Sequence, residues 1–379
     1  MAQASTRLAP IDSLRGLVMM LMVVDHLREF FFLHAQVVDP VDLTVTPAAL
    51  ALTRFASHPC APVFVFLAGM SAWLSGQKAG GDRRTISTYL FKRGVFLVVL
   101  ELTVVNFAWT FAFPSATLYL QVIWAIGLSM VVLAGLVWLP PGGLLATSLA
   151  IVAGHNLLTD VHVGPDSPWH AIWAVLHQRD WIVLDGLRLR TSYPVLAWFG
   201  VAGLGYAFAP VYARLSPEGR RALCLRLGLA CLVGFAALRA LNGYGEPKPW
   251  KVHPDVLTTV VAFFNLTKYP PSLDFLLATL GLGLCALAWL DRLPSRAATV
   301  LQTLGSAPMF FYLLHLYALH MVYLLAWHVC GANHGTRFGF DAVWQLWAAW
   351  PVTIALLYWP TRWFARLRST VRHPWMRYL

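Results

Sequence analysis

The chain has 379 residues, of which 58% are hydrophobic and 12% are charged, and its mean hydropathy is +0.63. This composition excludes a soluble globular protein of ordinary surface composition and indicates a multi-pass membrane protein. The formal net charge of +11 does not call for a nucleic-acid partner, because the basic residues concentrate in alternate connections between apolar segments, as the positive-inside rule describes.

Apolar runs that are long enough to cross a bilayer occur ten times along the chain. The predicted spans are 14–33, 59–76, 93–112, 118–139, 143–158, 192–213, 222–241, 273–291, 306–329 and 342–361. The fifth is short and interrupted by glycine, so it is the weakest of the set. We therefore predict an all-α, polytopic membrane bundle of about ten transmembrane helices, forming a single domain over residues 1–379.

The distribution of charge predicts the orientation of the bundle. Lys and Arg gather near residues 78–93, 214–226, 292–296 and 362–377, which places both termini in the cytoplasm and makes anionic membrane lipids natural neighbours. The first apolar run carries several charges and no small-residue cleavage site follows it, so we expect it to remain as a helix rather than to act as a signal peptide. The five cysteines are scattered and indicate neither a metal site nor a disulfide framework.

Ionisable side chains follow one stripe of the first predicted helix. Arg15 and His26 are eleven positions apart, which is three turns and about 20° out of line. The residues on this stripe are Asp12, Arg15, Met19, Met22, His26 and Glu29, and Asp25 and Arg28 flank it. Because ionisable groups within a bilayer are costly and commonly face a functional cavity, we expect the chemistry to lie on this helix.

Other polar groups fall mostly in the outer halves of their spans. His58 opens the second span, Glu101 lies within the third and Gln121 starts the fourth. His315 and His320 are five apart in the ninth span, so we expect them to point to different sides of it. Simple interhelical hydrogen bonds explain the two histidines as well, and an arginine partner would explain Glu101. Several of these groups are nevertheless expected to share one water-accessible cavity.

Two of the candidates have a further simple explanation. Ser57 and Pro59 suit the N-cap and the first position of a helix, which would make His58 a boundary residue without chemistry. Arg15 is near enough to the cytoplasmic end to snorkel beside Asp12. The sequence leaves these alternatives open.

Two long outer connections, about 156–191 and 242–272, have room for structure outside the bilayer. Both are aromatic and polar, and the tryptophan-rich stretch 168–178 is compatible with an interfacial helix. Tryptophans there suit stacking on sugar rings and interfacial anchoring equally well.

Five segments together carry a family pattern. They are IDSLRGL at 11–17 with Asp25-His26 downstream, FASHPCAPVFVFLAG at 55–69, LQVIWAIG at 120–127, NLTKYPPS at 265–272 and YLLHLYALH at 312–320. Over nearly its whole length the chain resembles the bacterial membrane proteins grouped with the catalytic domain of heparan-α-glucosaminide N-acetyltransferase. It is also similar to the wider transmembrane acyltransferase superfamily, including the acyltransferase-3 proteins, in which an arginine, ten arbitrary residues and a histidine occur in the first helix; Arg15 and His26 match that spacing.

The resemblance implies an acyltransferase that takes an acetyl or other acyl group from cytoplasmic acyl-CoA, its co-substrate. The acceptor would be a glycan or a small amino or hydroxy compound on the far side of a bacterial inner membrane. In the lysosomal enzyme the active-site histidine lies in the loop before the second span, where the match around His34 and His58 is ambiguous, and that enzyme has no counterpart of Asp25-His26. The resemblance therefore does not decide which histidine reacts.

Imidazole suits acyl transfer near neutral pH, either as a general base or as a nucleophile. We predict that His26 has this role, with His58 as the second candidate. Glu29, one turn further on, is better placed to orient His26 than the adjacent Asp25, which points about 100° away.

Arg15, about 16 Å inward from His26 by the helical rise, is predicted to face the CoA phosphates, with Asp12 beside it. The predicted substrate-binding side chains are Arg28, Glu101, Gln121, Asn265, Lys268, Tyr269, His315 and His320.

Buried ionisable groups also describe a proton-coupled transporter of a small solute, although no inverted repeat is evident. A third possibility is a catalytically silent scaffold for envelope-polysaccharide machinery. Binding or hydrolysis of acetyl-CoA would distinguish the enzyme from the transporter. The identity of the acceptor, the acyl chain length and a homodimeric state are not readable from the sequence.

Overall fold

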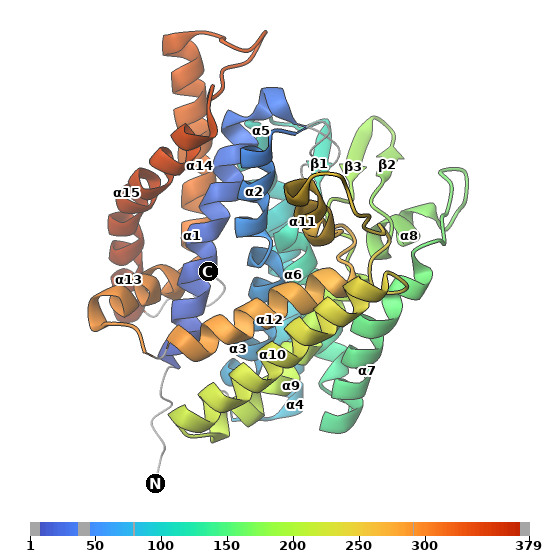
Figure 1. Cartoon of the computed structure of the whole chain (residues 1–379). Coiled ribbons are helices and arrows are strands. Elements are labelled where there is room, and N and C mark those ends of the chain that lie inside the picture. The colour runs from blue at the N-terminus through green and yellow to red at the C-terminus, as the bar shows by residue number, and fades with distance from the viewer. Residues whose placement is uncertain (1–7, 37–45, 79, 291, 372–379) are drawn as a thin grey trace. The chain divides into compact units, whose positions relative to one another are not determined.

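The computed structural model describes residues 8–36, 46–78, 80–290 and 292–371 (Figure 1). Helices dominate it, as predicted, and those ranges also contain three short strands. The described residues form two compact units: a larger unit of residues 61–249 and 266–288, and a smaller unit of residues 8–60, 250–265 and 289–371. The single domain predicted for the whole chain stays a prediction.

The larger unit holds most of the helices and the whole sheet. Its elements are α3 (Cys60–Lys78), α4 (Arg83–Leu100), η2 (Glu101–Val105), α5 (Asn106–Thr110), β1 (Thr117–Tyr119), α6 (Val122–Leu136), α7 (Pro141–Gly154), η3 (His155–Leu158), α8 (His170–Leu176), β2 (Trp181–Leu184), β3 (Leu187–Arg190), α9 (Leu196–Arg214), α10 (Pro217–Leu241) and nearly all of α12 (Leu273–Leu290).

Small residues bring the helices of the larger unit into close contact. A Cβ atom placed on Gly69 of α3 would lie 2.0 Å from the carbonyl oxygen of Ala202 on α9, and one on Gly205 of α9 would lie 2.0 Å from that of Phe66. Any side chain at these glycines would push the helices apart. Such close approach is typical of membrane bundles, because lipid gives apolar helices no hydrophobic reason to associate.

The three strands form one small sheet with the order β1-β3-β2. Strands β2 and β3 are an antiparallel hairpin, and β1 pairs with β3 in parallel. The hairpin turns at Asp185-Gly186, which have φ of 37° and 87°, the left-handed conformation that an Asp-Gly hairpin turn requires. This sheet was not predicted from the sequence, because an alternation of only three or four residues is too short to identify a strand.

The smaller unit is built around α1. Its elements are α1 (Ala9–Phe31), η1 (Leu33–Ala35), α2 (Ala48–Ser57), α11 (Val256–Phe264), α13 (Ser295–Ser306), α14 (Pro308–Cys330) and α15 (Val343–Thr370). Helix α1 contacts α2, α13, α14 and α15 (Figure 1). Helices α1 and α13 approach each other closely, since a Cβ atom placed on Gly305 of α13 would lie only 1.9 Å from the carbonyl oxygen of Asp12 on α1. Trp350 joins α15 to α1 by donating from Nε1 to the carbonyl oxygen of Met20 at 2.7 Å.

Every predicted span coincides with a helix in the structure. Within the described residues, six helical segments are long and apolar enough to cross a membrane: Ala48–Lys78, Pro141–Leu158, Leu196–Arg214, Pro217–Leu241, Leu273–Leu290 and Pro308–Cys330. The first predicted span corresponds to the 23-residue helix α1, which carries five charged residues. The total of ten spans stays a prediction.

Candidate functional site

Two histidines from different helices meet in the smaller unit. Nδ1 of His26 on α1 lies 2.6 Å from Nε2 of His315 on α14. The rings are nearly parallel, with an interplanar angle of 5° and centroids 4.8 Å apart, and the edge of Tyr312 contacts His26. His315 is completely buried, whereas His26 is only half-buried. One imidazole is therefore fixed inside the bundle, and the other is held by it at an accessible position.

The hydrogen bonds assign the protons on both rings. Nδ1 of His315 lies 2.8 Å from the carbonyl oxygen of Phe311, and because a carbonyl only accepts, this nitrogen carries a proton. In a neutral ring the other nitrogen, Nε2, is then an acceptor, so Nδ1 of His26 donates to it. Neutral His26 is left with its lone pair on Nε2. The arrangement prepares Nε2 of His26 to accept a proton.

His320 contacts the same helix as His315. Its ring packs against Phe30, with centroids 5.1 Å apart, and Phe30 is one turn beyond His26 on α1. The two histidines were predicted to point to different sides of their helix, and both contact α1 in the structure. An interhelical hydrogen bond was the alternative explanation for His315, and the structure has one, with the predicted base as its partner.

A compact charge network surrounds Asp25, next to His26. Asp25 Oδ1 lies 2.5 Å from a guanidinium nitrogen of Arg54 on α2 and 3.5 Å from Nε of Arg28. Arg28 also pairs with Glu29, which accepts a hydrogen bond from Gln36 at 2.8 Å. Two cations and two carboxylates thus neutralise one another, as low-dielectric surroundings require.

The network departs from the sequence prediction in two ways. Arg54 was not predicted, because the chain before residue 58 was not recognised as the helix α2; the signal available was an apolar decapeptide with one arginine. Glu29 was predicted to orient His26, but its carboxylate contacts Arg28 and Gln36, and the side chain at hydrogen-bond distance from His26 is His315.

Arg15 lies near the start of α1. Its guanidinium donates to Asp12 Oδ1 at 2.7 Å and to the carbonyl oxygen of Gly305 at 3.0 Å. The first contact is the one that the snorkelling alternative describes, and the second places a cation at the C-terminal end of α13, where the helix dipole favours it. Arg15 thus ties α1 to α13.

His58 lies where α2 passes into α3. It is buried, its backbone N–H donates to the carbonyl oxygen of Phe55 at 3.3 Å, and its ring meets the face of Phe55. The proposed N-cap role of Ser57 was wrong. Ser57 is the last residue of α2 and its hydroxyl donates to the carbonyl oxygen of Arg54. The physical reason is that His58 keeps helical dihedrals (φ −54°, ψ −44°), so no extended N-cap residue precedes α3.

Glu101 and Gln121 meet at the start of α6 in the larger unit. Glu101 is completely buried in the π-helical turn η2. Its Oε2 accepts a hydrogen bond from the backbone N–H of Trp124 at 3.0 Å. Gln121 occupies the N-cap position of α6 without a side-chain cap, so Glu101 supplies the hydrogen-bond acceptor that the first backbone N–H groups of the helix need. This contact gives Glu101 a structural partner other than the arginine that we considered.

Lys268 and Tyr269 lie in the turn before α12. The Tyr269 hydroxyl donates to the Tyr193 hydroxyl at 3.0 Å, and the Nζ of the buried Lys268 lies 5.3 Å from the centre of the Tyr269 ring. Glu246 holds the turn by accepting hydrogen bonds from the backbone of Thr267 at 2.9 Å and from Ser272 at 2.6 Å. The predicted residue Asn265 is the C-cap of α11 and belongs to the smaller unit.

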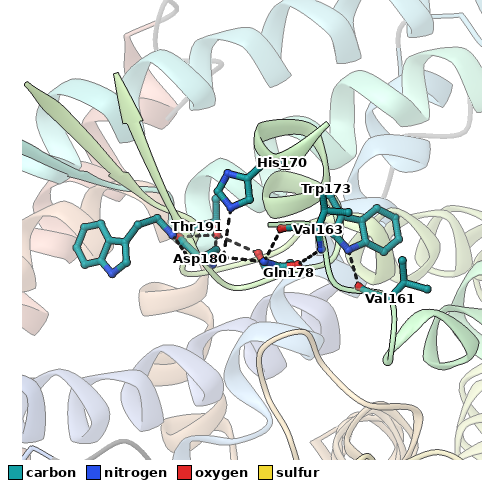
Figure 2. Close-up of polar contacts among 8 residues, drawn as sticks. Val161, Val163, His170, Trp173, Gln178, Asp180 and Thr191 are labelled. Atoms are coloured by element: carbon teal, nitrogen blue, oxygen red, sulfur yellow. Dashed lines mark hydrogen bonds and ion pairs between the residues drawn. The ribbon is translucent and has the colours of Figure 1, made fainter. Parts of the chain in front are cut away.

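The connection before α9 contains a polar cluster around Asp180 (Figure 2). Asp180 Oδ2 accepts from Gln178 at 2.6 Å and lies 3.3 Å from His170 Nε2, and its Oδ1 accepts from the backbone of Trp181. Partial burial raises the pKa of Asp180, but these hydrogen bonds outweigh it and leave the pKa below its ordinary value. A helix, α8, does form within the predicted stretch 168–178, and its position at a membrane interface stays a prediction.

The predicted site residues divide between the two units. The smaller unit contains Asp12, Arg15, Asp25, His26, Arg28, Glu29, His58, Asn265, His315 and His320, and the larger unit contains Glu101, Gln121, Lys268 and Tyr269. Within the smaller unit, the structure joins His26 to His315, Asp25 to Arg28, and Asp12 to Arg15.

Comparison with known proteins adds one finding. Residues 7–236, more than half of the chain, match the family model described as heparan-alpha-glucosaminide N-acetyltransferase, catalytic. None of the curated protein sequences compared with the chain is similar to it. The matched region includes Arg15, His26 and His58, whereas His315 lies beyond it.

Proposed function

The chain belongs to the family of the heparan-alpha-glucosaminide N-acetyltransferase catalytic domain, and we propose that it transfers an acetyl or other acyl group from cytoplasmic acyl-CoA across a bacterial inner membrane. The acceptor is an amino or hydroxyl group of a glycan or small molecule on the far side. The observation that supports this most strongly is the contact of His26 with the buried His315, because it leaves His26 Nε2 ready to accept a proton at a half-buried position.

In the proposed reaction, His26 Nε2 removes the proton of the acceptor N–H or O–H while that nitrogen or oxygen attacks the thioester carbonyl carbon. The bond between carbon and sulfur breaks, and the CoA thiolate leaves and takes up the proton. His315 keeps its hydrogen bond to Nδ1 throughout, so the ring is held in one orientation as its charge changes. A two-step route, in which Nε2 itself carries the acyl group, uses the same lone pair.

The remaining predicted residues have supporting roles in this proposal. Arg15, with Asp12 beside it, binds the phosphates of CoA, for which a guanidinium is well suited. The paired charges of Asp25, Arg28 and Glu29 hold the far end of α1 and present Arg28 to the acceptor. His58 is the alternative base.

Protein purified in lipid nanodiscs tests the proposal with radiolabelled acetyl-CoA and with glucosamine as the acceptor probe. We expect saturable binding of acetyl-CoA, release of free CoA thiol, and a higher release rate with glucosamine. A transporter would neither bind nor hydrolyse acetyl-CoA. Solute uptake into proteoliposomes in the absence of acyl-CoA, together with no binding of acetyl-CoA, would contradict the proposal.

An Arg15→Ala variant tests the proposed CoA contact. Loss of one charge-assisted contact to phosphate should raise the Kd for acetyl-CoA about tenfold, while Arg84→Ala, at an exposed site of α4, should leave it unchanged. If Arg15→Ala lowers only the melting temperature and keeps the wild-type Kd, then Arg15 is solely an ion-pair partner of Asp12.

A further inference from the structure

The sheet of the larger unit places an arginine between two aromatic residues. The strand register aligns Tyr119 of β1, Arg190 of β3 and Trp181 of β2 in one row, so their side chains lie on one face. Cζ of Arg190 is 5.0 Å from the centre of a Trp181 ring, and Cζ of Arg188, two residues earlier on the same face, is 4.3 Å from it. The small sheet thus presents guanidinium groups and flat rings together.

A further guanidinium lies beside this row. Arg179 is exposed, and its Cζ lies 5.1 Å from the centre of the Tyr269 ring. The pKa of the half-buried Arg190 is lowered, first by burial and next by the positive charge of Arg179. We call the set of Tyr119, Arg179, Trp181, Arg188 and Arg190 the arginine face.

The positive charge of this face is not neutralised by the protein itself. Neither Arg179 nor Arg190 forms an ion pair with a carboxylate in the ranges that the structure describes. Asp180 is the acidic group whose charge reaches Arg190, but its oxygens are occupied by Gln178, His170 and the backbone of Trp181 (Figure 2). The like charges of Arg179 and Arg190 repel each other, and an anion bound by both would offset that repulsion.

The ring surfaces define the rest of the ligand. An isolated anion would need only the two guanidinium groups, whereas the indole of Trp181 and the phenol ring of Tyr269 lie directly beside them. A small carbohydrate has both parts, because its ring carbons present C–H groups to aromatic faces and a charged substituent pairs with arginine.

We propose that the arginine face binds a sugar that carries an oxyanion, namely a phosphate, sulfate or carboxylate group. Arg179 and Arg190 hold the oxyanion, and Trp181 supports the sugar ring. This binding site goes beyond the proposed function and does not depend on it.

Equilibrium binding to the full-length protein in nanodiscs, followed by saturation-transfer NMR titration, tests the site. The probes are glucose 6-phosphate, glucose 6-sulfate, glucuronate and uncharged glucose. We expect at least one of the three anionic sugars to bind at least tenfold more tightly than glucose. Arg179→Gln and Arg190→Gln should each weaken that binding about tenfold or more, whereas Arg84→Gln should not change it. The probe that binds most tightly identifies the oxyanion.

The proposal is overturned if no anionic sugar binds more tightly than glucose, or if Arg179→Gln binds the best probe as the wild type does. Arg179 is exposed, so the Arg179→Gln variant is expected to fold. If Arg190→Gln does not fold, Arg190→Lys replaces it in the binding experiment, because lysine keeps a cation in the row. CoA thiol release measured on the same samples separates the two ideas. If no anionic sugar binds but thiol release is normal, only the proposed sugar site is contradicted. If an anionic sugar binds but acetyl-CoA does not, only the proposed acyltransferase function is contradicted.

Discussion

The surroundings of the histidine pair in the smaller unit and the arginine face of the larger unit differ in how their positive charges are neutralised. Around His26, Arg28 and Arg54 are matched by Asp25 and Glu29 within the protein. On the arginine face, Arg179 and Arg190 have no such partner in the described part of the chain. Arg28 and Arg54 are buried and need carboxylate partners within the protein, whereas the more exposed Arg179 and Arg190 can be neutralised by a bound anion. The first arrangement is suited to moving a proton, and the second to holding an anion.

The largest difference between the two regions should be in stability. Arg54→Leu leaves the carboxylate of Asp25 short of a cation in low-dielectric surroundings, so we expect a loss of about 3 kcal/mol or more in the free energy of unfolding. Arg188→Gln removes only an exposed cation–π contact with Trp181 and should cost less than about 1 kcal/mol.

Thermal denaturation in nanodiscs measures both variants. The double variant Asp25→Asn with Arg54→Leu should recover part of the loss, because it removes both charges. Equal melting temperatures for Arg54→Leu and Arg188→Gln would mean that the two regions do not differ in the way proposed.

The next largest effect concerns the positioning role of His315. His315→Leu removes the acceptor for the proton on His26 Nδ1, so the rate of CoA release should fall about 100-fold, or about 2.7 kcal/mol of transition-state stabilisation, with the Kd for acetyl-CoA unchanged. His315→Gln supplies an amide oxygen that can accept the same proton and should retain more of the activity. If both variants keep the wild-type rate, the hydrogen bond between the histidines has no part in the reaction.

The sequence predicted what depends on hydropathy and on residues near one another in the chain. Each span predicted from a run of apolar residues overlaps a helix of the structure. Helical spacing placed Asp12 beside Arg15, which the structure confirms. The contact between His26 and His315 was beyond this reasoning, because it depends on how α14 is rotated against α1. Apolar periodicity does not specify that rotation when nearly every face of α14 is apolar.

The arginine face was missed for a different reason. Its strands are only three or four residues long, and the row from Tyr119 to Trp181 joins positions that are more than 60 residues apart. One local signal was present, since Asp185-Gly186 between the tetrapeptides WIVL and LRLR is a typical hairpin turn. Recognition of this turn would have predicted the pairing of Trp181 with Arg190, but not the pairing of Arg190 with Tyr119.

The most direct test is the rate of acetyl-CoA-dependent acyl transfer, measured as CoA thiol release by three single-histidine variants in nanodiscs. His26→Ala should lower the rate by 10²- to 10⁴-fold, the range for loss of a general base. His58→Ala and His328→Ala, the latter at an exposed position of α14, should stay close to the wild-type rate. A folded His26→Ala protein with full activity, or loss of activity in His58→Ala alone, would contradict the assignment of His26 as the reacting group.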